Sequence, residues 1–401
     1  MGRNYQLLSA IFFVYFMAWS FSFSLYPIWL SQEAGLNGEE VGIVFSANAL
    51  ISLLIMPWYG FIQDKLVLKK GLLYFIAVTM ILLGPFVNLF YSPFLKSHFL
   101  FAAFLGGIVF SFVFLAGVGV LESYIDKQSR AINFEFGKAR MWGSLGWAAA
   151  SYFAGLSFNI SPSLNYWLTS IAALFFLVLL KQVKVTTDAM KLNCLPTLLE
   201  KRSLLSFFKI PGLWRLSTFV IGVSCIYAVF DQQFAIYFTT FFDERDTGRE
   251  YYGYLMSAQV VFEALFMFIG VKWVNRLGVK RALLCSGVLM AIRISLSGVV
   301  MDSYSISLLK LLHAVELPLM LIAIFKYINM HFEARYSAMI YMIGFQFTTQ
   351  FMASFLAIGV GGLYDQIGYA ETYRYLGLVV SVFIIISYFT LSKDKAKRNF
   401  G

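Results

Sequence analysis

The sequence predicts an all-α membrane protein made of twelve transmembrane helices in two bundles of six. Of its 401 residues, 60% are hydrophobic and only 13% are charged, which is about half the charged share of a typical soluble protein. Apolar stretches long enough to cross a bilayer recur about twelve times along the chain. The widest polar gap, residues 182–211, leaves six of these stretches on each side.

Each stretch has the length that a helix needs to span the hydrocarbon core of a bilayer. The bundles are expected at 1–181 and 212–392, joined by a cytoplasmic central loop at 182–211 and followed by a cytoplasmic tail at 393–401. The first stretch is too long for the apolar core of a cleavable signal peptide. The predicted transmembrane stretches are 7–30, 41–62, 72–93, 98–121, 141–160, 164–181, 212–241, 251–272, 281–300, 304–328, 337–361 and 371–392.

Charges in the connecting loops predict the orientation. The net charge is +10. Loops after even-numbered stretches and the tail carry many cations, whereas loops after odd-numbered stretches carry acids and few cations. The positive-inside rule therefore places both termini in the cytoplasm. Because short basic loops explain the charge, we expect the lipid bilayer, and no nucleic acid, as a partner. The cations are Lys65, Lys69, Lys70, Lys127, Arg130, Lys138, Arg276, Lys280, Arg281, Arg335, Lys393, Lys395, Lys397 and Arg398; the acids are Glu33, Glu39, Glu40, Asp243, Glu244, Asp246 and Asp302.

The sequence does not predict an enzyme. Cys194, Cys225 and Cys285 show neither paired nor metal-like spacing. The three histidines do not cluster, and no glycine-rich phosphate loop is present. We therefore expect no metal site, no bound cofactor and no soluble sensor domain.

A short basic loop recurs in the two halves of the chain. The sequence Gly60-Phe-Ile-Gln-Asp64-Lys65-Leu-Val-Leu-Lys69-Lys70 follows the second stretch, and Asn275-Arg276-Leu-Gly278-Val-Lys280-Arg281 follows the eighth. In register, Asp64-Lys65 aligns with Asn275-Arg276, and Lys69-Lys70 aligns with Lys280-Arg281. Parallel repeats of this kind are typical of transporters whose site lies between the halves. The loops resemble the Gly-x-x-x-Asp-Arg-x-Gly-Arg-Arg signature of the major facilitator superfamily, with Lys65 for Arg and Val67 for Gly, and this resemblance implies the major facilitator fold.

Ionisable groups interrupt the apolar stretch around 306–325. Lys310, His313 and Glu316 are spaced three residues apart, so on a helix they follow one face as a shallow spiral. Inside a bilayer each such group costs about 2.5 kcal/mol or more unless it meets a partner or water. This cost favours a role in moving protons or ions; a structural ion-pair network is the alternative.

More polar groups fall in the neighbouring stretches of the same half. A carboxylate that is shielded from water holds a proton more readily at neutral pH, and histidine titrates near that pH. Acids and a histidine gathered in one half are therefore what a proton relay needs, the alternative being a static charge cluster. The groups are Tyr227, Asp231, Gln232 and Gln233 in the seventh stretch, Glu263 in the eighth and Arg293 in the ninth.

In the first half, one helix face carries the groups that a sugar would need. Arg140, Ser144 and Trp147 stand at i, i+4 and i+7 of the fifth stretch, and Glu122 lies near the end of the fourth. A guanidinium donates two hydrogen bonds to paired hydroxyls, and an indole covers the C–H face of a sugar ring. The alternative is an Arg140–Glu122 pair at a membrane boundary with Trp147 as an interface anchor. Three glycines in this segment, Gly137, Gly143 and Gly146, are expected to let a neighbouring helix or ligand approach closely.

Together these motifs resemble the oligosaccharide:proton symporter family, which includes lactose and sucrose permeases. The matching blocks run from the first to the eleventh stretch, so the resemblance covers essentially the whole chain. The blocks are Tyr26-Pro-Ile-Trp-Leu30, Asn133-Phe-Glu-Phe-Gly137 through Trp147, Val229-Phe-Asp-Gln-Gln-Phe234, Leu309-Lys-Leu-Leu-His-Ala-Val-Glu-Leu-Pro318 and Ile343-Gly-Phe-Gln346.

The resemblance implies roles for individual residues. Glu122 and Arg140 match the pair that grips sugar hydroxyls, and Trp147 matches the indole that stacks on a sugar ring. The full implied set for substrate binding is Glu122, Arg140, Ser144, Trp147, Gln232, Glu263 and His313.

For the proton, Glu316 resembles the carboxylate that is protonated and deprotonated in each cycle, and Arg293 the cation that favours its deprotonation. His313 and Tyr227 would bridge the proton and sugar sites. The other implied roles are an interhelical charge pair for Asp231 and Lys310, and a gating loop for Asp64 and Lys65. The proton is the coupling ion, and we expect no other cofactor.

Departures from the lactose permease pattern bear on the substrate. Ala228 and Thr349 replace both members of its second Asp–Lys pair, and Glu263 lies about one turn beyond the position of its acid, which Val260 occupies. The block Gln259-Val-Val-Phe-Glu263 is similar to that of sucrose permeases, whereas Trp147 and Phe136 are closer to lactose permeases. We expect import of a disaccharide by a monomer in the bacterial cytoplasmic membrane, with sucrose favoured. A galactoside:proton symporter for lactose, melibiose or raffinose, and an uncoupled sugar facilitator, are the alternatives.

Overall fold

The computed structural model describes residues 3–66, 68–184, 210–333 and 336–394. Every regular element within these ranges is a helix, and each of the twelve predicted stretches coincides with helix. By length and composition, eight helices in the described ranges could cross a membrane, or nine if one bent pair forms a single span. The predicted central loop and tail lie mostly outside the described residues, as does Cys194, whereas Cys225 and Cys285 carry free thiols.

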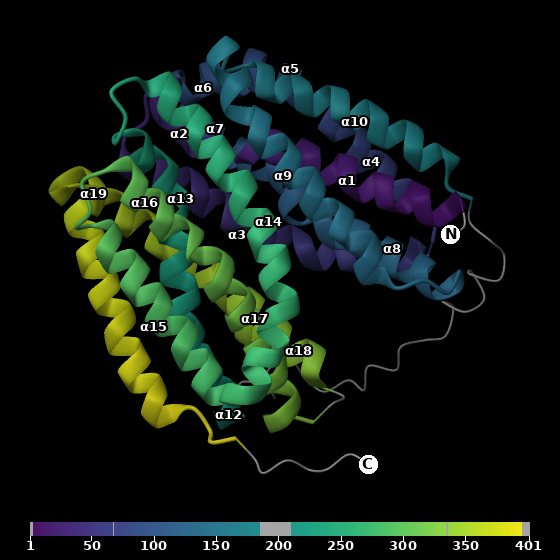
Figure 1. Ribbon diagram of the computed structural model, residues 1–401. Helices are drawn as coiled ribbons and strands as arrows, with labels where there is room; N and C mark the ends of the chain where they lie inside the picture. The colour runs from purple at the N-terminus through teal and green to yellow at the C-terminus, as the bar shows by residue number, and fades with distance from the viewer. Residues whose placement is uncertain (1–2, 67, 185–209, 334–335, 395–401) are drawn as a thin grey trace. The chain divides into compact units, whose positions relative to one another are not determined.

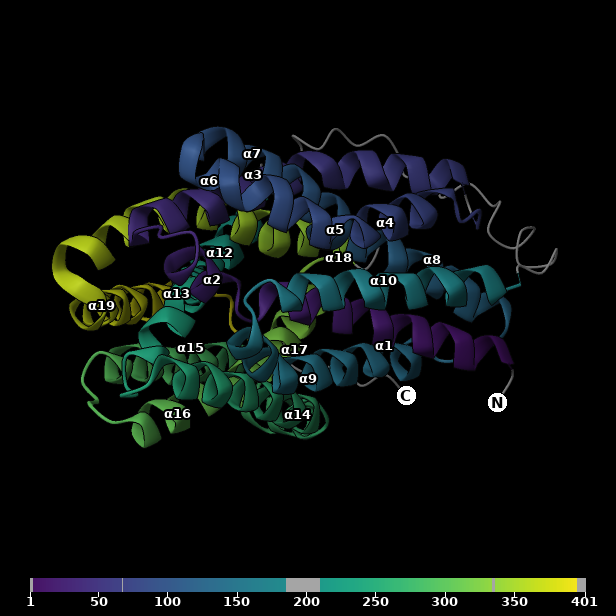
Figure 2. The same cartoon turned by 90° about the horizontal axis from the view of Figure 1, so that it is seen from above.

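The helices form two compact units. The first unit contains the described residues of Met1–Leu198 together with Ala235–Val261. Within it, α1 packs along both α9 and α10, and the three helices lie side by side in Figures 1 and 2. Its elements up to residue 184 are α1 (Arg3–Phe23), α2 (Tyr26–Gln32), α3 (Gly38–Leu66), α4 (Gly71–Ile81), α5 (Leu83–Pro85), η1 (Phe86–Tyr91), α6 (Ser92–Ser97), α7 (Phe99–Phe110), η2 (Ser111–Leu115), α8 (Gly117–Ala131), α9 (Phe136–Ile160) and α10 (Leu164–Gln182).

The second unit contains the described residues of Leu199–Phe234 and Phe262–Gly401. In it, α15 packs against both α17 and α19 (Figure 1). The helix α19 runs as one element from the eleventh predicted stretch through the twelfth, and it is kinked at Gly368, whose φ is 81°. The remaining elements of the chain are α12 (Pro211–Val220), η4 (Ile221–Cys225), α13 (Ile226–Thr239), α14 (Arg245–Leu277), α15 (Val279–Ser297), α16 (Ser303–Leu311), α17 (His313–His331), α18 (Ser337–Tyr341), η6 (Met342–Phe347) and α19 (Thr348–Thr390). Since the units divide within α13 and α14, the bundle boundaries inferred from the polar gap stay a prediction.

Short π-helical turns, η1, η2, η4 and η6, interrupt several of the spans. A π turn accommodates one extra residue and rotates the side chains that follow it relative to an uninterrupted α-helix. The turn η4 directly precedes the part of α13 that carries Tyr227 and Asp231. The direction of these two side chains therefore cannot be extrapolated from residues before Ile221.

Glycines in α9 allow α1 to approach at backbone distance. A Cβ atom at Gly146 would lie 2.1 Å from the carbonyl oxygen of Phe13, and one at Gly143 would lie 2.8 Å from the ring of Phe16. These contacts confirm the close helix approach predicted for both glycines. At Gly137, in the first turn of α9, a Cβ would meet nothing within 4 Å. No described helix therefore packs closely at Gly137, and close approach of a ligand there stays a prediction.

In each half of the sequence, a lysine side chain binds carbonyl oxygens at the C-terminal end of the last helix. Lys70 Nζ donates to the carbonyl oxygens of Leu180 at 2.6 Å and Val183 at 2.5 Å, at the end of α10. Lys280 Nζ donates to the carbonyl oxygen of Leu391 at 2.6 Å, at the end of α19. Cations at helix C-termini satisfy orphan carbonyl groups and complement the helix dipole. The repeat predicted from the basic loops is therefore visible as a shared contact, although sequence register pairs Lys70 with Arg281 and not with Lys280.

Large apolar side chains lie on the outside of the helices. Among the most exposed are Leu54 at 69%, Leu100 at 70%, Phe268 at 74% and Phe389 at 77%. Water-exposed surfaces of soluble monomers rarely carry apolar side chains at this density. These faces are suited to lipid, which agrees with a chain that crosses the membrane several times.

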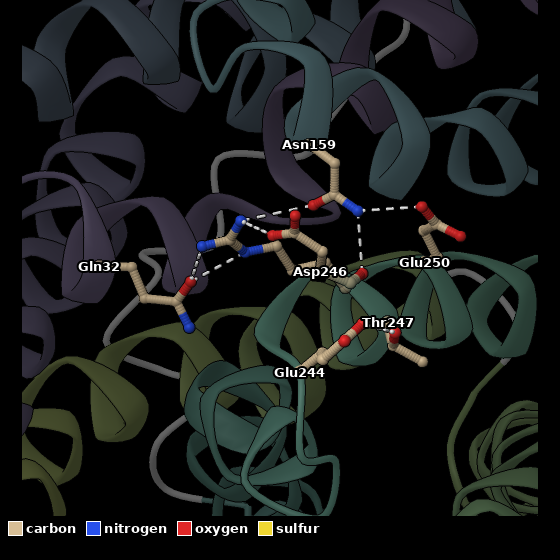
Figure 3. A network of polar contacts seen from close by, with 7 residues as sticks. Gln32, Asn159, Glu244, Asp246, Thr247 and Glu250 are labelled. Atoms are coloured by element: carbon tan, nitrogen blue, oxygen red, sulfur yellow. Dashed lines mark hydrogen bonds and ion pairs between the residues drawn. The ribbon is translucent and has the colours of Figure 1, made fainter.

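A polar network joins the ends of α2, α9 and α14 in the first unit (Figure 3). The guanidinium of Arg249, only 12% exposed, donates to Gln32 Oε1 from Nε at 2.9 Å and from Nη2 at 2.5 Å. Its Nη1 donates to Asp246 Oδ1 at 2.9 Å and to Asn159 Oδ1 at 3.4 Å. Asn159 in turn donates to the carbonyl oxygen of Asp246 and to Glu250 Oε1. Two glycines let the helices meet here, because a Cβ at Gly155 would lie 2.4 Å from the carbonyl oxygen of Arg249, and one at Gly253 would lie 2.6 Å from that of Ser151.

Replacing Arg249 with Met should destabilise this junction. The variant keeps a long apolar side chain but removes hydrogen bonds to three side chains, one of them an ion pair. A mostly buried, charge-assisted contact of this kind is worth about 2 kcal/mol. We expect a lower thermal unfolding midpoint for the purified protein, measured by circular dichroism. The matched control is Arg130→Met, which removes an exposed ion pair with Asp126 in α8 and should change the midpoint less. An unfolding midpoint equal to that of the native protein would show that the network does not hold the helix ends.

Candidate functional site

The first cluster of functional candidates lies between α8 and α9. Arg140 Nε donates to Glu122 Oε1 at 2.7 Å, and the two side chains are 32% and 36% exposed. Because only Nε takes part in this bond, the paired Nη1 and Nη2 donors of the guanidinium are not used in the ion pair. The Arg140 Cζ atom lies 4.1 Å from the ring centroid of Phe16 in α1, which supports the guanidinium plane. The arrangement presents a fixed, planar, two-pronged donor that remains partly exposed.

Trp147 lies farther along α9, held against α1. Its indole meets the ring of Trp19 edge-to-face, with centroids 5.5 Å apart. The hydroxyl of Ser20 donates to the carbonyl oxygen of Trp147 at 3.0 Å. The same hydroxyl lies 2.8 Å from those of both Ser24 and Ser151. Together these contacts fix the position of the Trp147 backbone while leaving its side chain half-exposed.

Sequence reasoning missed Trp19 and the three serines. In the sequence they look like ordinary residues of an apolar stretch, and only the crossing of α1 with α9 brings them together. The spacing of Ser20 and Ser24, one helical turn apart, was the single available signal. Ser144, which the sequence did single out, lies half-exposed on α9 between Arg140 and Trp147.

The second cluster lies in the second unit, around Glu316 of α17. This carboxylate is fully buried and pairs through Oε1 with Nη2 of the equally buried Arg293 in α15. The same Oε1 lies 3.0 Å from Nδ1 of His313. The other imidazole nitrogen, Nε2, lies 2.8 Å from the hydroxyl of Tyr227 in α13, and the two rings stack at 4.6 Å. A continuous line of titratable or hydrogen-bonding groups thus runs from Arg293 through Glu316 and His313 to Tyr227.

Several polar atoms in this line have no partner. Glu316 Oε2, Arg293 Nε and Arg293 Nη1 are buried without a hydrogen-bond partner among the described residues. Unpaired buried atoms of charged groups are costly and rare in proteins. Oε2 is therefore the carboxylate oxygen of Glu316 that no described residue contacts through a hydrogen bond.

Lys310 takes a different direction from His313 and Glu316. Its buried amine pairs with Asp231 Oδ1 on α13, and Nζ lies 4.9 Å from the ring centroid of Phe234. The single spiral expected for the three residues is interrupted, because α16 ends at Leu311 and α17 begins at His313. Lys310 therefore pairs with Asp231, whereas Glu316 pairs with Arg293.

Two more of the predicted site residues, Gln232 in α13 and Glu263 in α14, are half-buried within the second unit. Gln233 is buried, and its Oε1 accepts a hydrogen bond from Tyr369 at 3.2 Å. Asp64 and Lys65 were expected in a loop, but α3 continues to Leu66 and places both in its last turn.

Comparison with known proteins identifies the family. Residues 1–399 match the model of the LacY proton/sugar symporter family. The chain belongs to this family. Membership makes the chain a transporter and not an enzyme, with a sugar substrate and a coupled proton.

Individual relatives of the LacY proton/sugar symporter family are similar over almost their whole length. The raffinose permease of Escherichia coli is 40% identical, with 98% of this chain and 94% of that protein covered. The sucrose permease of Escherichia coli is 38% identical at the same coverage, and the melibiose permease of Enterobacter cloacae is 41% identical over 97% of this chain and 93% of that protein. Among solved structures, the nucleoside transporter NupG superposes with a TM-score of 0.82 at 14% identity, covering 98% of this chain and all of that one. This chain therefore has the major facilitator fold that the basic loops predicted, and it is a multi-pass membrane protein.

Proposed function

We propose that this symporter imports sucrose together with a proton by alternating access. The geometry that carries the coupling is the line Arg293–Glu316–His313–Tyr227, because it links a carboxylate with one unpartnered oxygen to a hydrogen-bonding chain. Sucrose is supported by the Gln259–Glu263 block and by similarity to proteins named raffinose and sucrose permeases. Raffinose is sucrose extended by one galactose, so the two names share a sucrose unit.

In the proposed cycle, a proton adds to Oε2 of Glu316. The neutral carboxyl no longer attracts Arg293, so the guanidinium is released and His313 and Tyr227 can reorganise. Sugar and proton then raise each other's affinity, by about 1–3 kcal/mol if the coupling is typical. The pair of Asp231 and Lys310 is proposed to hold α13 to α16 throughout, because removing one partner would leave the other charge buried and unpaired.

On the sugar side, Glu122 and Arg140 would hold adjacent hydroxyls while Trp147 stacks on the ring. Ser144, Gln232, Glu263 and His313 are proposed to complete the binding set. Asp64 and Lys65 are proposed to act in gating from the end of α3. We further propose a functional monomer in the bacterial cytoplasmic membrane, with both termini in the cytoplasm, which the basic loops favour.

The test is uptake by purified protein in sealed vesicles, across a panel of sucrose, raffinose, melibiose and lactose. With an imposed pH gradient, acidic outside, we expect sucrose to accumulate above its external concentration. Without a pH or voltage difference, sucrose should equilibrate and go no further. Competition among the four sugars should rank sucrose first.

Two results would overturn the proposal. Accumulation of melibiose or lactose with no transport of sucrose would favour a galactoside:proton symporter, which the melibiose permease relationship supports. Equal sugar entry with and without the gradient, and no alkalinisation of a weakly buffered medium on adding sugar, would favour an uncoupled facilitator.

A further inference from the structure

The indole of Trp19 occupies a distinctive position in the first unit. It lies between the two groups proposed to hold the sugar, because Phe16 carries the Arg140 guanidinium on one side and Trp147 lies on the other. The centroid distances are 5.5 Å from Trp19 to Phe16 and 5.5 Å from Trp19 to Trp147. These rings form a continuous series of contacts from the guanidinium to the indole of Trp147, with Phe16 itself buried. A sugar that is held by Arg140 and stacked on Trp147 would therefore lie close to Trp19.

The indole N–H of Trp19 has no hydrogen-bond partner among the described residues, although the atom is buried. An unsatisfied buried donor costs about 1–3 kcal/mol, and most buried polar side-chain atoms in proteins have a partner. The ring is fixed by stacking on Phe114, with centroids 5.8 Å apart and planes 6° apart. The donor is therefore held in place without a protein acceptor, next to a proposed ligand site. Trp19 as a whole is half-buried, so part of its side chain remains accessible next to Trp147.

The neighbouring backbone supports the same assignment. Ser20, the next residue, donates to the Trp147 carbonyl oxygen and contacts Ser24 and Ser151. These bonds lock the segment carrying Trp19 to the segment carrying Trp147, so the two indoles keep a fixed mutual geometry. Such preorganisation is what a specificity-determining site requires.

We infer that Trp19 is a further sugar-binding residue, whose indole N–H donates a hydrogen bond to a hydroxyl group of the sugar stacked on Trp147. This inference rests on the proposed sugar site. Sugar binding would supply the missing acceptor, and discrimination against sugars without that hydroxyl would follow because the buried donor would again be unpaired.

The test combines removal of the donor with removal of each candidate acceptor. Trp19→Phe keeps an aromatic ring and removes only the N–H group and part of the ring area. Dissociation constants for the purified full-length protein are measured with the best-bound sugar of the panel of sucrose, raffinose, melibiose and lactose, and with its singly deoxygenated analogues. In the native protein, the analogue lacking the contacted hydroxyl should bind about fivefold or more weakly, the loss of one neutral hydrogen bond.

In Trp19→Phe, binding of the parent sugar should weaken by a similar factor, and the same analogue should bind as well as the parent. Trp142→Phe is the matched control, since Trp142 is 41% exposed on α9 and its loss should leave every dissociation constant unchanged. Unfolding midpoints report whether the variant is merely misfolded. If every deoxy analogue loses the same factor in native and Trp19→Phe proteins, Trp19 does not contact a hydroxyl. If the native protein binds none of the four sugars, the proposed function fails and this inference fails with it.

Discussion

Replacing Glu316 with Gln is expected to abolish accumulation of sugar while preserving sugar binding and exchange. Gln keeps the size of the side chain and one carbonyl acceptor for His313, but it cannot release or take up a proton. Translocation of the loaded carrier in both directions needs no change of protonation, so exchange of internal for external sugar should continue. In vesicles with an imposed pH gradient, the ratio of internal to external sugar should not rise above one.

The variant leaves the buried guanidinium of Arg293 without its counter-charge, so some loss of stability is expected as well. Expression and unfolding midpoint therefore accompany the transport assay. Glu371→Gln is the matched control, because Glu371 forms an exposed ion pair in α19 and its neutralisation should not change accumulation. If Glu316→Gln still concentrated sugar against its gradient, the proton would bind elsewhere.

Replacing Arg140 with Lys should weaken sugar binding by about 100-fold. An ammonium group can keep the charge beside Glu122, but it cannot present two parallel donors in one plane. The loss of a pair of charge-assisted hydrogen bonds corresponds to about 3 kcal/mol, which gives that factor. The measurement is the dissociation constant of the best-bound sugar, with the unfolding midpoint recorded in parallel.

Arg130→Lys is the control for this substitution, since Arg130 pairs with Asp126 on the exposed side of α8. It makes the same chemical change outside the proposed site and should not alter sugar affinity. Native affinity in Arg140→Lys would instead support a purely structural ion pair between Arg140 and Glu122.

Features that depend on many consecutive residues could be predicted from the sequence, whereas features that depend on a single residue could not. Spanning helices depend on apolar runs of about twenty residues, so each predicted stretch coincides with helix. The π turns η1, η2, η4 and η6 of the described residues escaped prediction, because one additional residue within an apolar run leaves no mark in composition. Close helix approach is found at Gly143 and Gly146 and not at Gly137, and the three glycines could not be told apart from the sequence alone.

The functional clusters show a similar division. Charged residues inside apolar stretches are conspicuous because they are costly, and this made Arg293, Lys310 and Glu316 visible. Spacing alone could not reveal that Lys310 and Glu316 turn to different partners on different helices. Trp19 and the serines near it carry no such cost signal, so only contacts between distant parts of the chain distinguish them.

The amines of Lys70 and Lys280 bear on how the two halves of the chain have diverged. Each amine binds the final carbonyls of the sixth helix in its own half, yet the residues stand one position apart when the basic loops are matched letter by letter. A flexible four-carbon side chain can deliver its charge to the same place from either position. If the two halves descend from a duplicated ancestor, the contact between a lysine amine and the helix end has been conserved, whereas the aligned sequence position of the lysine has not. Such equivalent residues are found by comparing contacts in the structure and not by aligning the sequences.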